Sequence, residues 1–178
     1  LGRLHMQALR QMSLLPLLLI CLFSHPLRAD NSITAFMQLV SFNTQLARKP
    51  SQLVTFKSVE QGENATDIDH VTISETGTYF ILISLETGAD QQKSSVTTGF
   101  LDAWLERNDK PIDFTVIRTT IRPNELLVVT TQAILKLNKG DKLSIKYASN
   151  NRDIGLISIH DNPDTPPISS VNLSLYKL

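Results

Sequence analysis

Between Leu135 and Tyr147 apolar residues alternate with polar ones, and the alternation is interrupted once, by Asn-Lys-Gly-Asp at residues 138–141. Successive side chains of a β-strand point to opposite faces, so this pattern predicts two half-buried strands. Asn, Gly and Asp in close succession are typical of a tight turn. The segment therefore predicts a β-hairpin.

Short runs of strand-forming residues, separated by turn signals, recur along the rest of the chain. We expect strands at residues 34–42, 52–56, 69–73, 78–85, 99–106, 112–117, 126–137, 142–147, 154–159 and 168–178. The strand at residues 78–85 is expected to end at Thr87-Gly88-Ala89-Asp90. No run has the period of an amphipathic helix. The pattern predicts a single all-β domain of about ten strands, a sandwich or barrel.

The predicted strand at residues 78–85 is apolar on both faces. Its side chains divide into two sets, with Tyr79, Ile81, Ile83 and Leu85 on one face and Phe80, Leu82 and Ser84 on the other. A strand with one face in water would be polar at alternate positions, so we expect both faces to be covered. The second cover is either a partner subunit or a loop of the same chain.

The charges of the chain balance, with 17 basic and 17 acidic residues. Residues 1–29 hold three arginines and no acidic residue, which leaves residues 30–178 mildly acidic. This composition disfavours a protein that binds nucleic acid or anionic membranes.

The N-terminal region has the pattern of a secretory signal. Residues 13–23 form an apolar run between Arg10 and Ala29, and this run is shorter than the roughly 20 residues that span a bilayer. We expect residues 1–29 to be removed, leaving residues 30–178 as a secreted, extracellular domain without a stable membrane span. An uncleaved anchor or a core helix is the alternative. The only cysteine, Cys21, lies in this run, so the mature domain is expected to lack disulfides and thiolate metal sites.

Five motifs follow one another in an order that resembles a known family. They are Ala35-Phe36, Gly77-Thr78-Tyr79-Phe80-Ile81, Trp104-Leu105-Glu106-Arg107-Asn108, Leu137-Asn138-Lys139-Gly140-Asp141-Lys142-Leu143 and Val171-Asn172-Leu173-Ser174-Leu175-Tyr176. Together they resemble the globular head domain of complement C1q and its relatives in the tumour-necrosis-factor-like superfamily, over about residues 32–178. The chain departs from that pattern at Ile81, where Phe is usual, at Asp109, where Gly is usual, and in its closing strand.

The resemblance implies a ten-stranded jelly-roll β-sandwich that assembles as a homotrimer. It also implies that the strand face opposite Tyr79 forms the subunit interface. The implied interface residues are Phe80, Leu82, Ser84, Tyr176 and Leu178. The chain contains no Gly-X-Y collagen repeat, and a likeness of fold does not transfer complement or cytokine activity.

Signals for catalysis or metal binding are sparse. Within residues 30–178 the histidines are His70 and His160, and no H-E-x-x-H, G-x-S-x-G or P-loop pattern occurs. We interpret the loop residues Asp67 and Asp69 as solvated loop charge and expect no cofactor, with a calcium site as the alternative. We therefore predict a non-enzymatic, secreted homotrimeric module that binds a protein or glycan through its loops. A structural surface or matrix trimer and a small hydrolase are the other hypotheses.

Overall fold

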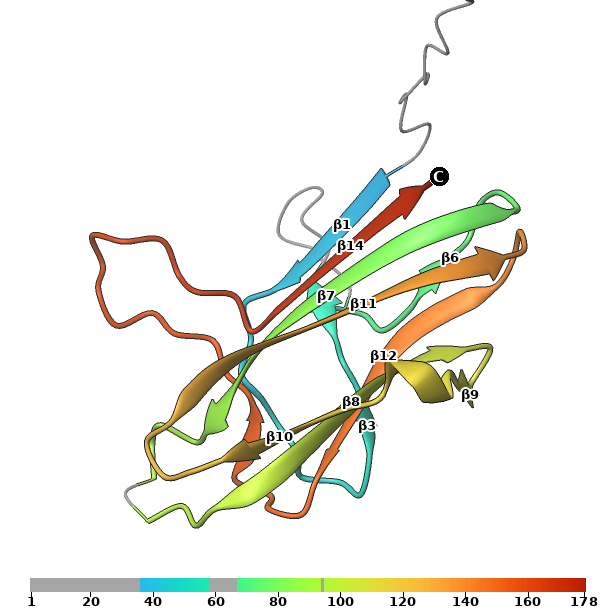
Figure 1. Ribbon diagram of the computed structural model, residues 1–178. Coiled ribbons are helices and arrows are strands. Elements are labelled where there is room, and N and C mark those ends of the chain that lie inside the picture. The colour runs from blue at the N-terminus through green and yellow to red at the C-terminus, as the bar shows by residue number, and fades with distance from the viewer. Residues whose placement is uncertain (1–35, 58–66, 94) are drawn as a thin grey trace, which may run out of the picture. The chain divides into compact units, whose positions relative to one another are not determined.

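The computed structural model describes residues 36–57, 67–93 and 95–178. Two antiparallel sheets account for most of this chain (Figure 1). The first sheet has the order β1 (Phe36–Ser41), β14 (Val171–Lys177), β7 (Gly77–Ala89), β13 (Ile154–Leu156) and β2 (Gln45–Leu46), with β11 (Leu126–Leu137) on the other side of β7. The predicted signal region, residues 1–29, lies outside the described residues.

The second sheet is built around β8 and β12. Its order is β10 (Ile117–Ile121), β8 (Gly99–Arg107), β12 (Lys142–Ser149) and β3 (Gln52–Leu53), with β9 (Lys110–Pro111) beside β8 and β6 (Val71–Thr72) beside β12. A separate pair is formed by β4 (Phe56–Lys57) and β5 (Asp67–Ile68), and a 3-10 turn, η2, spans Asp113–Thr115. The predicted all-β jelly-roll sandwich is confirmed by this arrangement.

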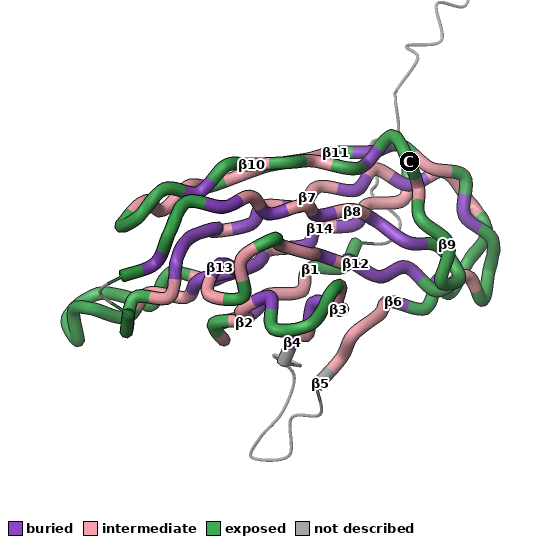
Figure 2. Tube along the Cα trace, turned by 90° about the horizontal axis from the view of Figure 1, so that it is seen from below, coloured by how far each residue is buried: buried purple, intermediate pink, exposed green. Residues whose placement is uncertain are grey.

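The core lies between the two sheets, and burial follows the period-2 alternation that the sequence predicts. Along β7, Tyr79, Ile81, Ile83 and Leu85 are buried, and the residues between them are partly exposed (Figure 2). Alternate residues of β8 and β12 meet them from the second sheet, among them Leu101, Leu105, Ile145 and Tyr147. The predicted division of β7 into two faces is confirmed.

The end of β7 differs from the prediction. Thr87, Gly88 and Ala89 continue the strand instead of ending it. Both of its sides are paired there, with Leu127 of β11 and Leu156 of β13 opposite Thr87. The buried Thr87 hydroxyl donates a hydrogen bond of 2.8 Å to the Leu127 carbonyl, so a polar residue is satisfied inside the sheet.

The predicted strand at residues 112–117 was also wrong. The chain forms η2 there and begins β10 only at Ile117. Thr115 explains the turn, because its buried hydroxyl donates to the Ile112 carbonyl at 2.7 Å and accepts from the Leu105 amide at 2.9 Å. The predicted strands at 52–56, 69–73, 154–159 and 168–178 are shorter or interrupted in the structure.

Two of the motifs behind the family resemblance lock neighbouring turns together. Asn108 and Asp109 adopt φ of 52° and 63°, and Gly140 adopts 89°, a conformation that only glycine reaches without strain. The side-chain Nδ2 of Asn108 donates to the Asp141 carboxylate at 2.8 Å, and that carboxylate also accepts from the backbone N–H of Asn138 at 2.8 Å. These hydrogen bonds hold the pKa of Asp141 below its ordinary value, with the Asn138 bond as the largest cause. The two motifs, at residues 104–108 and 137–143, therefore stabilise adjacent turns of the fold.

Candidate interaction surfaces

The outer face of the first sheet carries an apolar row that crosses four strands. Phe36 of β1 pairs with Tyr176 of β14, Tyr176 pairs with Phe80 of β7, and Phe80 pairs with Ile134 of β11. The Tyr176 ring centroid lies 6.4 Å from that of Phe36 and 6.4 Å from that of Phe80. We call these four residues the apolar row.

The apolar row is open to solvent in the single chain. Phe36 is 70% exposed and Ile134 is 62% exposed, while Phe80 and Tyr176 are partly buried by one another. Removing one such side chain from water contributes about 1.5–3 kcal/mol when it is fully buried. A continuous apolar strip of this kind is typical of an association surface.

Beyond the apolar row this face is mixed, with more polar than apolar side chains. The next row contains Gln38, Ser174, Leu82 and Gln132, and the one after it contains Val40, Asn172, Ser84 and Thr130. Ser84 and Thr130 lie within 3.4 Å through their hydroxyl oxygens. Glu86 follows on β7, and its partial burial raises the pKa of its carboxyl group.

The structure places the predicted interface residues together. Phe80, Leu82, Ser84 and Tyr176 share this outer face. Leu178 is 71% exposed just past the end of β14, and its amide donates to the Thr78 carbonyl at 2.8 Å. Their role in subunit contact stays a prediction.

Sequence reasoning missed Phe36 and Ile134 as members of this surface. Ile134 lies on a strand whose same-face neighbours, Thr130 and Gln132, are polar, so the period alone gives no apolar outer face. Only the register of β11 with β7 brings Ile134 opposite Phe80. The sequence therefore held no local signal for Ile134, because the pairing of β11 with β7 is a property of the tertiary fold.

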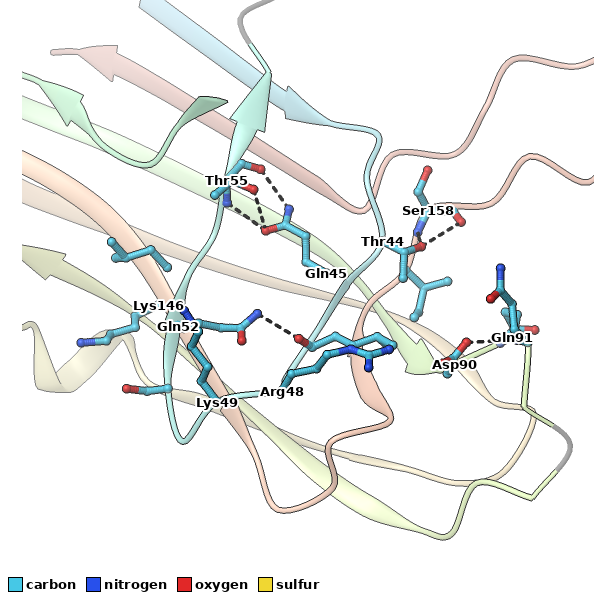
Figure 3. A pocket seen from close by; sticks show the side chains of 15 residues that line it. Thr44, Gln45, Arg48, Lys49, Gln52, Thr55, Asp90, Gln91, Lys146 and Ser158 are labelled. Carbon is cyan, nitrogen blue, oxygen red and sulfur yellow. Dashed lines mark hydrogen bonds between the residues drawn. The ribbon is translucent and has the colours of Figure 1, made fainter. Parts of the chain in front are cut away.

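A second surface is an open groove of about 990 Å³ beside β2 and β3 (Figure 3). Its walls come from β2, the loop that leads to β3, the residues that follow β7, and Lys146 of β12. The Gln45 side chain is fixed in the groove, since its Oε1 accepts from the Thr55 amide at 2.8 Å and its Nε2 donates to the Thr55 carbonyl at 2.9 Å. Gln52 donates to the Leu46 carbonyl at 2.9 Å.

The groove is predominantly cationic. Its lining includes Arg48, Lys49 and Lys146 against the single carboxylate of Asp90. We call it the basic groove. Tyr147 lies behind it and donates to the Gln45 carbonyl at 3.0 Å; burial raises the pKa of this phenol to about 12, so it stays protonated at neutral pH.

The histidines and the candidate calcium residues do not converge on a site. His70 Nδ1 lies 2.7 Å from Oδ1 of its chain neighbour Asp69, and both side chains are well exposed. His160 is exposed in a separate loop. The Asp67 side chain lies outside what the structure describes. In residues 36–57, 67–93 and 95–178 no three His, Cys, Asp or Glu side chains gather as metal ligands, and a calcium site stays an alternative hypothesis.

In the same part of the chain, no helix has the length and hydropathy needed to cross a membrane.

No family model matches the sequence, and no curated protein matches it. The chain is similar to three crystal structures of murine APRIL, determined at pH 5.0, 8.0 and 8.5. Their TM-scores are 0.47, 0.46 and 0.46, at 17%, 18% and 16% sequence identity, and each comparison covers 80% of this chain and 98% of the other. The jelly-roll fold itself is established by the strand order given above.

Proposed function

We propose that this chain is a secreted homotrimeric binding module of the C1q-like kind, which recognises protein or glycan ligands through its loops. The observation that carries the proposal is the apolar row of Phe36, Tyr176, Phe80 and Ile134 on the outer face of the first sheet. Its occupant in this proposal is a second copy of the chain. Burial of the row on a neighbouring copy removes four large apolar side chains from water.

A second apolar patch favours a closed trimer over a symmetric dimer. Phe114 is 71% exposed and Val116 is 51% exposed, in and after η2. η2 packs near β11, at the edge of the sandwich away from β1. A ring of three copies joins two different patches at each contact, whereas a two-fold dimer joins one patch to itself. The apolar row and the Phe114–Val116 patch supply such a pair.

Light scattering coupled to size exclusion tests the assembly on the purified protein at micromolar concentration. We expect the mass of three chains for the parent, and a monomer for Phe80→Glu combined with Ile134→Glu, because two carboxylates would then be buried without partners. Ile168→Glu is the matched control, since Ile168 is 50% exposed outside both patches. A parent protein that runs as a clean monomer would overturn the proposal.

The alternative function is a structural surface or matrix trimer without a specific soluble ligand. It shares the assembly and differs in recognition. Glycan-array and cell-surface binding with the trimeric protein separates the two, because only the binding module gives saturable signals.

A further inference from the structure

We propose that the basic groove binds acidic glycans, with Arg48 and Lys49 contacting carboxylate or sulfate groups. This inference deepens the proposed function, on which it rests, by naming a ligand class and a place on the fold. The groove is separate from the association surfaces, because none of its lining residues belongs to the apolar row or to the Phe114–Val116 patch.

The three cations of the groove differ in how far they are already neutralised. Lys146 Nζ lies 3.4 Å from Oε1 of Glu106, whose side chain is only 4% exposed, so this lysine already has an anionic partner. Arg48 and Lys49 are exposed, and within the described ranges no ion pair joins either of them to a carboxylate. The nearby Asp153 is paired with Lys93, whose hydrogen bond is the largest cause of the lowered pKa of that carboxyl group, and the charge of Arg48 is a smaller cause. Two neighbouring cations are therefore available to an anionic ligand.

The loop that carries these cations is anchored to rigid backbone. The Ala47 amide donates to the Ile154 carbonyl at 2.9 Å. β2 approaches β13 so closely that a Cβ at Gly155 would lie 2.3 Å from the Gln45 carbonyl oxygen. Together with the fixed amides of Gln45 and Gln52, this packing holds the groove in one shape before a ligand arrives. A pre-formed site loses less conformational entropy on binding.

The remaining lining favours sugars over other anions. Thr44, Ser51, Gln91 and Gln92 add hydroxyl and amide groups that can donate to, and accept from, sugar hydroxyls. No aromatic side chain lines the described groove, so it offers no platform for stacked bases and no aromatic anchor of the kind that dominates protein interfaces. Because the groove is open, a continuing chain can pass along it, and a trimer would present three grooves to one polymer.

Surface plasmon resonance tests this proposal with the purified protein over immobilised heparin, hyaluronan and dextran. Heparin presents sulfates and carboxylates, hyaluronan presents carboxylates alone, and dextran is neutral. We expect saturable, salt-sensitive binding to at least one acidic polymer and none to dextran. The double variant Arg48→Gln with Lys49→Gln is expected to lose about tenfold or more in affinity.

The matched control is Lys110→Gln with Lys139→Gln, which removes the same charge from two exposed lysines outside the groove. It is expected to keep its affinity within about twofold. Equal losses in both double variants, or no binding to either acidic polymer, would overturn the groove as the site. Light scattering on the same samples separates this failure from that of the proposed function: a trimer that ignores acidic glycans refutes only the groove, and a monomer that binds through Arg48 and Lys49 refutes only the trimer.

Discussion

The outer faces of the two sheets differ in whether their side chains find partners within the chain. On the second sheet, Arg118 makes hydrogen bonds of 2.6 and 2.7 Å to the Asp102 carboxylate and lies 4.1 Å from the centroid of the Phe100 ring. The Trp104 indole donates to Glu106 at 3.1 Å. On the first sheet the apolar row reaches into solvent, with Phe36 and Ile134 mostly exposed. The polar side chains of the second face are paired with one another within one chain, whereas the apolar row on the first face is left open to solvent.

The largest expected effect separates the two faces of β7. Ile81 is fully buried and Phe80, beside it, points outward. We expect Ile81→Ala to lower the free energy of unfolding by about 2–5 kcal/mol, because it leaves a cavity in the core. Phe80→Ala is expected to change the stability of the monomer far less and to weaken association instead.

Urea unfolding and light scattering on both variants measure these two quantities. Equal loss of stability in the two variants, with unchanged mass, would show that the outward face of β7 belongs to the core of a single chain.

A second, smaller contrast concerns two threonines. Thr115 is 1% exposed and bonds to the Leu105 amide, whereas Thr130 is exposed on the outer face of the first sheet. Thr115→Val leaves that buried amide without an acceptor and is expected to cost about 1–3 kcal/mol of stability. Thr130→Val is expected to leave stability nearly unchanged. Thermal unfolding of both variants measures the difference, and a stable Thr115→Val protein would contradict the role given to this hydroxyl.

The sequence predicted the fold well where strand-forming residues run on without a turn signal. Residues 126–137 contain no Gly, Pro or Asn, and β11 occupies this predicted range from end to end. The prediction was wrong at Thr115 and Thr87. At each position a buried hydroxyl donates to a backbone carbonyl, so the polar residue marks neither an exposed position nor the end of the predicted element. The alternation of apolar and polar residues does not show which hydroxyls are buried against backbone groups.

The candidate surfaces were predictable to different degrees. The place of Phe80 and Tyr176 on the outer face was predicted from the family resemblance and from a strand, residues 78–85, that is apolar on both faces. The place of Ile134 depends on the register of β11 with β7, which no local pattern contains. The basic groove could not be foreseen, because Arg48 and Lys146 are far apart in sequence and come together only when β3 pairs with β12. Sites of this kind require the tertiary fold.

Glu86 offers a pH test of the first face. Partial burial raises the pKa of its carboxyl group above the ordinary value of 4.5, so the folded state takes up a proton more readily than the unfolded chain. Its contribution to stability therefore rises as pH falls through the raised pKa toward 4.5 and is absent at higher pH. Further burial in a trimer would raise the pKa of Glu86 again, so the trimer would bind this proton more tightly than the monomer does. We therefore expect tighter association at acidic pH.

Sedimentation velocity across this pH range measures the dependence for the parent and for Glu86→Gln. We expect the variant to lose the part of the dependence that Glu86 supplies. An identical pH profile in both proteins would place Glu86 outside the buried contact.

The smallest effect is expected on the second face. Arg118→Gln removes the cation that Asp102 and the Phe100 ring hold, and burial of Arg118 is slight, so the pair is screened by solvent. Thermal unfolding is therefore expected to change little, and the mass by light scattering is expected to stay that of the parent. A fall to monomer mass in this variant, with Phe80→Ala unaffected, would reverse the comparison: the charged face of the second sheet would then be the one that neighbouring copies cover.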